Sequence, residues 1–385
     1  MEMEDTILST ILDNNSMQQI LSNLPVKALM KFKCVSKSWE SLTDDQSFIK
    51  LHQSKSHLQL LIMMYTDCSI KVYTPKDGFQ GGGALHKATI PWSGVSILKP
   101  INGLFCFVNV IHASCRIYNL GTRHATPWVS TSVPILRRPF VTQTPAFGFG
   151  FDPSTGKHKV LCFWDISNYG KVDHICEVLT VGENQWRKID EVPPVRPTGA
   201  IVYANGSLYQ RNRDDNFFKS PDIEVILAFD VGTEKFRVIP IPDFVIDSYR
   251  TSEDSFQLAQ YLLEVDGHIA LIDRLSDNVA KLWISDDDYL RQTDVKWVEE
   301  TIMLPFQWPS GRSIYFHAVQ GTKEIICRPL EARDVVTLYI YDRGMKSFRD
   351  INIVDLSPSM NPFVYGMFTL YESLLPVQTK EKIED

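Results

Sequence analysis

The sequence predicts a mainly β protein with a small helical module at its N-terminus, and three observations support this fold class. Apolar residues recur at helical spacing between residues 11 and 55, whereas after residue 56 they alternate as they do in strands. A turn pattern then recurs with a period typical of propeller blades. Hydrophobic residues make up 44% of the 385 residues, which excludes a chain that is disordered throughout.

Residues 11–55 are expected to form four short helices. The first carries apolar residues at steps of three and four positions. Pro25 suits the first turn of a second helix, and Ser36 can cap a third. Asp44 or Asp45 can cap a fourth helix. A module of about 45 residues buries too little surface to be stable alone, so we expect its apolar side to need a partner.

The rest of the chain is expected to form strands that a repeated turn separates. The turn has a polar residue first, a glycine two positions later and an aromatic residue six positions later, most clearly after Asp230 and Asp342. The first residues of the successive turns are Thr74, Asn119, Thr180, Asp230, Ser285 and Asp342. Asn-Gly or Asp-Gly pairs precede most of these turns and predict tight hairpins, which gives four strands in each repeat.

One strand is missing from the first repeat, and one is left over at the C-terminus. The surplus strand covers residues 363–371. We therefore expect a propeller of six blades, in which this last strand completes the first blade and removes the open sheet edges. Residues 378–385 are polar and are expected to form a solvated tail.

Composition disfavours several classes of partner and site. The formal net charge of −7 leaves no general basic field for nucleic acid. The N-terminus lacks the features of a secretory signal and no apolar run is long enough to span a bilayer, so we expect no membrane association and a cytoplasmic or nuclear location. Seven cysteines without a Cys-x-x-Cys pair are interpreted as reduced core residues. The histidines show no metal-ligand spacing, so we expect no metal, no cofactor and no catalytic site.

Three segments of the helical module form a recognisable pattern: Leu24-Pro25-Val26-Lys27, residues 34–39 and the pair Phe48-Ile49. Through them, residues 12–52 resemble the F-box of plant F-box proteins. Most of the remaining chain resembles the kelch-like F-box associated domain. The similar segments there are residues 101–106, residues 147–152 and residues 158–160. The domains would then be a tail at 1–10, the F-box at 11–55, the β-propeller at 56–377 and a tail at 378–385.

This resemblance implies a non-catalytic substrate-recognition subunit of a Skp-cullin-F-box ubiquitin-protein ligase. The F-box would bind the Skp-family adaptor and through it a cullin, and the β-propeller would bind a protein target for ubiquitination. The start of the F-box at Leu12 to Asn15 lacks the proline that is usual in the family. This departure motivates an alternative hypothesis, in which the chain is an interaction scaffold whose weakened F-box does not recruit the ligase. A third hypothesis, an enzyme of the galactose-oxidase kind on a kelch-like ring, requires a metal site.

The resemblance and the apolar pattern together suggest two sets of binding residues. The adaptor-binding set is Leu12, Met17, Ile20, Leu21, Leu24, Pro25, Val26 and Leu29, with Leu24 and Pro25 at its centre. The target-binding set consists of aromatic and arginine residues in irregular segments: Tyr169, Phe217, Phe218, Tyr249, Trp308 and Arg312. These six side chains could equally pack under their own loops. We also expect the F-box and the β domain to share few contacts across their linker.

Overall fold

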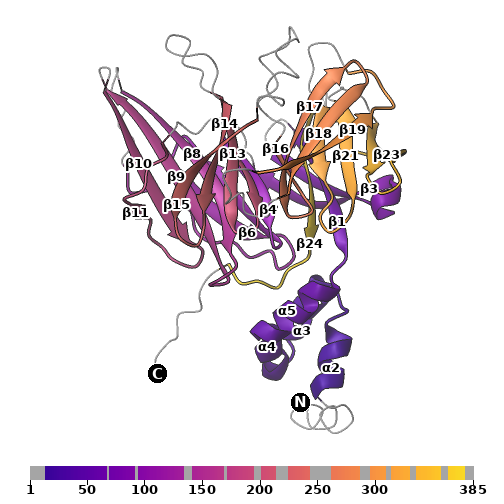
Figure 1. Ribbon diagram of the computed structural model, residues 1–385. Helices are drawn as coiled ribbons and strands as arrows, with labels where there is room; N and C mark the ends of the chain where they lie inside the picture. The colour runs from indigo at the N-terminus through magenta and orange to yellow at the C-terminus, as the bar shows by residue number, and fades with distance from the viewer. Residues whose placement is uncertain are drawn as a thin grey trace.

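The computed structural model places a module of four helices below a domain of twisted β-sheets (Figure 1). The described residues are 14–66, 69–91, 94–133, 141–168, 171–194, 201–213, 224–242, 262–286, 295–308, 314–329, 335–356 and 363–377. The mainly β fold with an N-terminal helical module is therefore confirmed.

The helical module follows the pattern that the sequence predicts, with small shifts at the helix ends. Its helices are α2 (Asn14–Leu21), α3 (Val26–Lys33), α4 (Lys37–Thr43) and α5 (Gln46–Lys55). Pro25 is the N-cap of α3 rather than part of its first turn. The Ser36 hydroxyl caps α4 by accepting a hydrogen bond from the Ser38 N–H at 3.2 Å. Asp45, and not Asp44, caps α5 through the Phe48 N–H at 3.0 Å.

The described strands form six four-stranded antiparallel units. Four units are separate sheets: β4 (Val95–Ile101) to β7 (Val129–Ser130), β8 (Val141–Asp152) to β11 (Arg187–Ile189), β12 (Ile201–Ala204) to β15 (Lys235–Pro240), and β16 (Leu262–Val265) to β19 (Trp297–Met303). Their inner pairs are β5 (Leu104–Asn109) with β6 (Ser114–Asn119), β9 (Lys157–Asn168) with β10 (Lys171–Thr180), β13 (Ser207–Arg213) with β14 (Glu224–Asp230), and β17 (His268–Ser276) with β18 (Val279–Ser285).

The other two units share one eight-stranded sheet. One contains β20 (Ile314–Ala318), β21 (Glu324–Pro329), β22 (Val336–Asp342) and β23 (Ser347–Val354). The other contains β24 (Phe363–Tyr371), β1 (Leu58–Thr66), β2 (Ser69–Pro75) and β3 (Gly82–Pro91), with the short 3-10 helix η1 (Gly78–Gln80) before β3. The C-terminal strand β24 pairs with β1 from Leu58↔Tyr371 to Tyr65↔Phe363, which confirms the predicted seam. The number of six blades stays a prediction.

The first strand of each unit lies next to the first strand of the following unit. Contacts run from β24 to β4, from β4 to β8, and onward through β12 and β16 to β20. Between β20 and β24, the Tyr315 hydroxyl donates to the Met367 carbonyl at 2.7 Å, and His317 Nε2 lies 3.0 Å from the Thr369 hydroxyl. These six strands therefore surround a common axis.

The repeated turn has a simple physical origin in the side chain of its first residue. Asp342 Oδ1 accepts hydrogen bonds from the N–H groups of Gly344 and Met345, and Asn119 Oδ1 accepts from Gly121. A Cβ on Gly344 would lie 3.2 Å from that same Asp342 oxygen. Glycine therefore suits this position because the capping oxygen leaves little room for a side chain.

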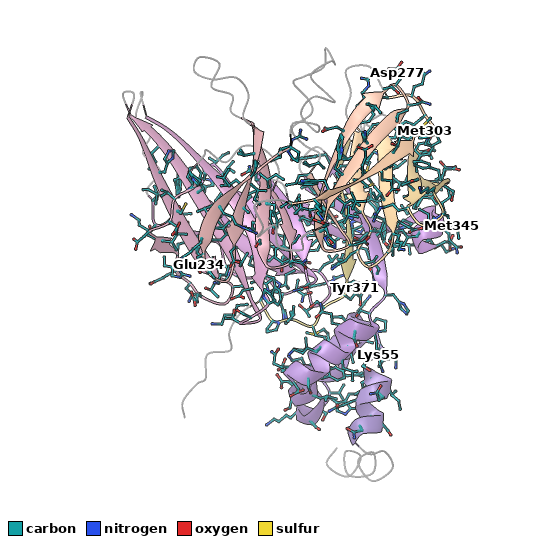
Figure 2. All side chains as sticks on the ribbon, viewed as in Figure 1. Lys55, Glu234, Asp277, Met303, Met345 and Tyr371 are labelled. Atoms are coloured by element: carbon teal, nitrogen blue, oxygen red, sulfur yellow. The ribbon has the colours of Figure 1, made fainter. Side chains whose placement is uncertain are left out.

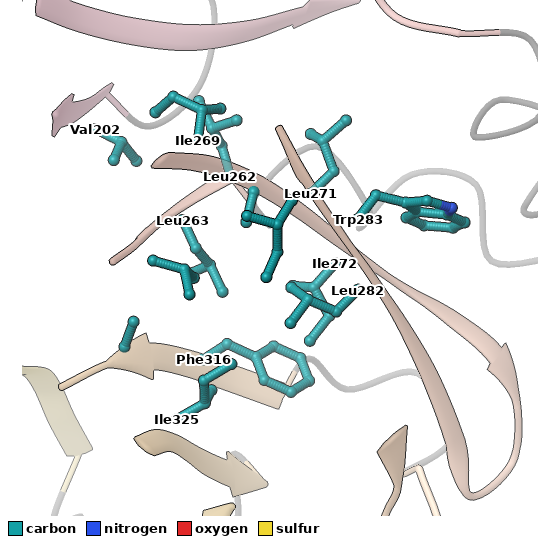
Figure 3. Packing of buried hydrophobic residues seen from close by; sticks show 14 of the residues in the cluster. Val202, Leu262, Leu263, Ile269, Leu271, Ile272, Leu282, Trp283, Phe316 and Ile325 are labelled. Atoms are coloured by element: carbon teal, nitrogen blue, oxygen red, sulfur yellow. The ribbon is translucent and has the colours of Figure 1, made fainter. Parts of the chain in front are cut away.

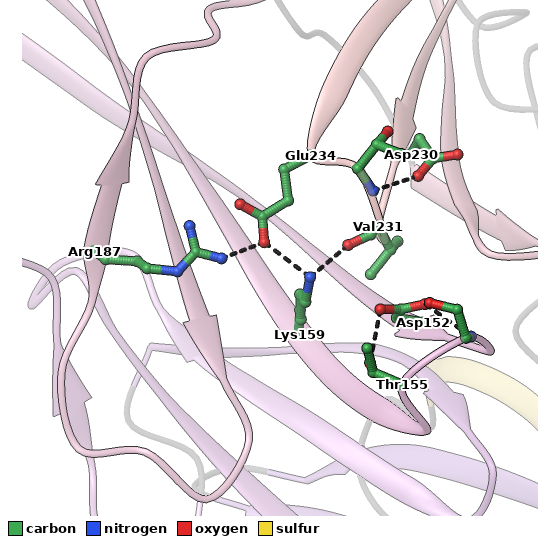
Figure 4. Close-up of polar contacts among 9 residues, drawn as sticks. Asp152, Thr155, Lys159, Arg187, Asp230, Val231 and Glu234 are labelled. Atoms are coloured by element: carbon green, nitrogen blue, oxygen red, sulfur yellow. Dashed lines mark hydrogen bonds and ion pairs between the residues drawn. The ribbon is translucent and has the colours of Figure 1, made fainter.

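Apolar residues pack between neighbouring units rather than within one continuous core. The largest cluster joins three units and includes Val202 of β12, Leu262 and Leu263 of β16, and Phe316 of β20 (Figure 3). Polar groups also connect units. Glu234, at the turn before β15, accepts hydrogen bonds from Arg187 of β11 and from Lys159 Nζ of β9 at 2.8 Å (Figure 4). Each unit therefore depends on its neighbours for the burial of its faces.

The two ends of the β domain differ in their distance from the helices. In Figure 2, Tyr371 and Lys55 lie at the junction with the helical module, and Asp277 lies at the opposite end. The turn at Asn102 and Gly103 that follows β4 is also on the helical side, where these residues share a cavity of about 330 Å³ with Lys50 of α5. The first strand of each unit therefore begins at the face opposite the helices.

Candidate adaptor-binding and target-binding surfaces

The helical module is held against the β domain by residues 372–377, which we call the C-terminal strap. Leu374 of the strap is buried in the apolar core of the helices. The other buried members of that core are Leu21, Val26, Leu29, Phe48 and Ile49. Val377, three residues later, is buried in a core cluster of the β domain, and Leu375 packs against both clusters. The strap therefore joins the two hydrophobic cores.

A carboxylate at the start of the strap binds the beginning of helix α3. Glu372 Oε2 accepts a hydrogen bond from the Val26 N–H at 3.0 Å, and its Oε1 accepts from Gln59 Nε2 at 3.1 Å. The first N–H groups of a helix have no partner within the helix, and negative charge is favourable near them. Glu372 therefore stabilises α3 and ties it to the start of β1.

A buried asparagine fixes the strap on the β domain. Asn119, at the end of β6, has no exposed surface, and its Nδ2 donates to the carbonyls of Ser373 and Leu375, both at 2.9 Å. Gly103 also approaches the strap closely, because a Cβ there would lie 2.4 Å from Ser373 Cβ. Gly103 has a positive φ of 82°, so a larger residue would be strained for both reasons.

These contacts correct the expectation that the F-box and the β domain share few contacts. That expectation assumed a plain linker near residue 56. The connection instead has a second part, because the strap returns to the helices from the far end of the chain. The apolar side of the helical module finds its partner, at least in part, within the same chain.

The adaptor-binding residues predicted from the sequence divide into buried and exposed members. Val26 and Leu29 have no exposed surface and Leu21 is also buried, so these three side chains form the core of the module. In this arrangement they offer no surface to a partner. Ile20 is 53% exposed, Pro25 is exposed, and Met17 and Leu24 are half-buried. Leu12 lies outside the described residues.

The structure adds an exposed apolar residue that the sequence analysis did not select. Val35 is 65% exposed after the end of α3, and the neighbouring Cys34 is exposed too, although it was expected in the core. A groove of about 880 Å³ between α2 and α4 lies on the same module. Its lining residues are Met17, Gln18, Lys37, Ser38, Glu40, Ser41, Leu42, Asp44 and Asp45. Exposed apolar side chains are typical of a protein-binding surface, so Val35 is a further candidate for adaptor contact.

Of the predicted target-binding residues, only Trp308 lies within the described residues. The other five, Tyr169, Phe217, Phe218, Tyr249 and Arg312, lie outside them. Trp308 is 6% exposed and packs against Phe316, with the ring centroids 5.9 Å apart. The Arg274 guanidinium lies 5.9 Å from the same indole ring. Trp308 is therefore packed in the core, which is the second of the two possibilities that the sequence left open for it.

Strand direction shows which strand ends lie at the face opposite the helices. Strands β13 and β14 pair as far as Arg213↔Glu224 at that face. Strands β15 and β19 also end there, at Pro240 and Met303, and β16 and β20 begin there. The sequence alone did not distinguish these faces.

Burial shifts the pKa of two titratable side chains in the described part of the β domain. His158 lies against the rings of Phe149 and Phe151, with centroids 5.6 and 4.8 Å away, and burial lowers its pKa to about 4. Burial raises the pKa of the Cys176 thiol to about 12. In the described ranges, no group of three or more His, Cys, Asp or Glu side chains is placed to hold a metal ion. None of the described helices is long and apolar enough to cross a membrane.

Comparison with known proteins agrees with both parts of this architecture. Residues 10–51 match the F-box domain, and residues 68–373 match the F-box associated beta propeller domain. The F-box protein At4g19940 of Arabidopsis thaliana is 26% identical over 370 residues, covering 87% of this chain and 84% of the relative. The putative F-box protein At4g38870 of the same plant is 25% identical over 370 residues, covering 87% and 80%.

Similarity to solved structures is weaker. A chain in the crystal structure of a nidogen/laminin complex aligns with a TM-score of 0.45 and 13% identity, over 82% of this chain and all of that chain. The family assignment rests on the sequence matches. The match to the F-box associated beta propeller domain covers most of the chain and includes the strands from β2 to β24. The chain belongs to the plant family of F-box proteins that carry an F-box associated beta propeller domain.

Proposed function

We propose that this chain is the substrate-recognition subunit of a Skp-cullin-F-box ubiquitin-protein ligase. The observation that carries the proposal is the two-sided helical module. One side is buried on the C-terminal strap through Leu374, while Ile20, Pro25 and Val35 remain exposed on the module. An F-box held in this way can bind a Skp-family adaptor without leaving the β domain.

The proposed adaptor surface is centred on Leu24 and Pro25 and includes Ile20 and Met17 beside them. Leu24 is half-buried, and its carbonyl lies 3.0 Å from His52 Nε2, which fixes the turn between α2 and α3. A preformed turn loses little conformational freedom on binding, which favours affinity. Val26 and Leu29 contribute through the core that supports this turn.

The β domain is proposed to bind the target protein. The face opposite the helices is the better candidate, because the helical face is partly covered by the strap and the module. The chain acts without catalysis of its own in this proposal, and it works in the cytoplasm or the nucleus, where ubiquitin ligases meet their targets.

Isothermal titration calorimetry against a purified Skp-family adaptor tests this proposal. The double substitution Leu24→Ala with Pro25→Ala should weaken adaptor binding by about 2 kcal/mol or more, because central apolar anchors carry most of the energy of an interface. Ile20→Ala should weaken it by a smaller amount. Lys27→Ala is the matched control, since Lys27 is an exposed residue of the same module and should change the affinity little.

The same titration distinguishes a ligase subunit from an interaction scaffold with a weakened F-box. If the wild-type chain shows no heat of binding to an adaptor that binds another F-box protein, the chain is an interaction scaffold with a weakened F-box. Circular dichroism and thermal melting of each variant check that the helices remain folded. An unchanged affinity for the double variant would remove Leu24 and Pro25 from the proposed surface.

A further inference from the structure

A cavity of about 480 Å³ runs along the axis of the β domain. It is lined by the first strands of five units, β4, β8, β12, β16 and β20, together with Val108, Val110 and Phe368. Its lining reaches the beginnings of these strands, at Ser96, Ile201, Leu262 and Ile314, which lie at the face opposite the helices. This volume is in the range of small-molecule binding pockets.

The walls of this axial cavity are mainly apolar. Five of the side chains that line it are Ile97, Phe147, Val202, Leu263 and Phe316. Figure 3 shows Val202, Leu263 and Phe316 where the units meet. Such walls favour a ligand with an apolar body, because burial of its surface releases water.

Two residues of opposite charge are among those that line the cavity. They are Lys99, the fifth residue of β4, and Glu264, the third residue of β16. Burial lowers the pKa of the Lys99 ammonium, and the negative charge of Glu264 partly opposes this lowering. Among the described residues, no ion pair within 4 Å joins Lys99 to Glu264, so their influence on each other acts over a longer distance.

Glu264 and Lys99 differ in the hydrogen bonds that they already make within the chain. Glu264 Oε1 accepts a hydrogen bond from the Gly267 N–H at 2.9 Å. Lys99 donates no hydrogen bond to any group in the described ranges. The neighbouring His317 is bonded to Thr369 at 3.0 Å, and burial holds its pKa well below its ordinary value, so it adds no positive charge near neutral pH. Lys99 is thus the group with donors to offer.

We propose that the axial cavity binds a small organic carboxylate with an apolar body, whose carboxylate accepts hydrogen bonds from Lys99 and whose body lies against Phe147 and Phe316. An ammonium donates strong hydrogen bonds to a carboxylate in a site of low polarity. The site lies on the β domain and is separate from the adaptor surface, so it goes beyond the ligase role and does not depend on it.

Octanoate is a suitable probe, because it combines a carboxylate with an apolar chain short enough for this cavity. Calorimetric titration into the full-length chain should give a Kd on the order of 1 mM, and octanoate should raise the melting temperature. Octylammonium, which has the same body and the opposite charge, should bind at least about tenfold more weakly. Acetate, which lacks the apolar body, should not bind measurably at the same concentrations.

Lys99→Met keeps the length of the side chain and removes its charge, so it should weaken octanoate binding about tenfold or more. Glu264→Gln is the matched control on the opposite wall, and it should leave binding unchanged or tighten it, because it removes a like charge. Equal binding of octanoate and octylammonium to the wild-type chain would overturn the proposal, whether or not either variant folds. So would an octanoate affinity that Lys99→Met leaves unchanged.

Discussion

The helical module and the β domain bury their apolar surface in different ways. The β domain packs each sheet unit against its neighbours, and the described strands supply several large clusters for this purpose. The helical module has one small cluster of six buried residues, and one of the six, Leu374, comes from the far end of the chain. The stability of the module therefore depends on the β domain more than the reverse.

The β domain and the helical module also differ in how the C-terminal part of the chain is joined to each of them. The β domain is closed by a strand, β24, which pairs with β1 along its length and carries backbone hydrogen bonds. The helices are attached by the strap, which has no regular structure and contacts them through a few residues, among them Glu372, Leu374 and Leu375. The seam of the β domain is therefore a long run of strand pairing, whereas the strap contacts the helices at a few points. The predictions below test this difference, from the largest effect to the smallest.

Deletion of residues 361–377 should have the largest effect, because it removes both β24 and the strap. The β domain would lose the strand that closes the seam, and β1 would become an open edge. We expect loss of the cooperative thermal transition in circular dichroism. Deletion of residues 378–385 is the control and should leave the melting temperature unchanged. Equal melting of the two truncations would contradict closure by β24.

Leu374→Ala should destabilise the helices by about 2 to 5 kcal/mol, the range for truncating a buried leucine side chain to alanine. The effect should be local. Hydrogen exchange measured by mass spectrometry should become faster in residues 14–55 and remain unchanged in the strands. Val377→Ala, a substitution in the same strap but in a cluster of the β domain, should show the opposite distribution. Uniform acceleration in both regions would mean that the two parts unfold together.

Acid should act on the β domain through His158. Its pKa falls from the ordinary 6.5 to about 4 on folding, because burial disfavours the charged ring. A group with a lowered folded pKa of this kind contributes stability above pH 6.5 that is lost as the pH falls from 6.5 to 4, here about 3 kcal/mol. His158→Gln, which does not titrate, should flatten this part of the curve of unfolding free energy against pH. An identical slope in wild type and variant would show that other groups control it.

The sequence predicted the local features of this fold and missed its longest-range contact. Ser36 and Asp45 were recognisable as caps because capping needs only a short polar side chain before an apolar run. The role of β24 was predictable because one unit lacked a strand. The strap was missed because residues 372–377 have no periodic pattern, and only the fold brings Leu374 to the helices. Its apolar Leu374, Leu375 and Val377, directly after a completed sheet, were the available signal.

The candidate surfaces were harder to predict for a related reason. In a small helical module, Val26 and Ile20 both belong to the apolar pattern, yet the first has no exposed surface and the second is 53% exposed. Helical spacing identifies an apolar face but does not say whether the same chain or a partner covers it. Trp308 shows the same ambiguity in the β domain, where an aromatic residue of an irregular segment is part of the core.

Glu372 allows the finest test of how the strap holds the helices. Its carboxylate accepts the Val26 N–H at 3.0 Å and also carries a charge beside the start of α3. Glu372→Gln keeps an acceptor and removes only the charge, so it should cost the helices about 0.5 kcal/mol. Glu372→Ala removes both and leaves a donor at the part-buried start of α3 without its partner, so it should cost about 1 to 2 kcal/mol. Hydrogen exchange of residues 26–33 measures both values against the strands of the same molecule. If the two variants cost the same, the charge carries the contact, and if neither accelerates exchange in α3, Leu374 alone attaches the module.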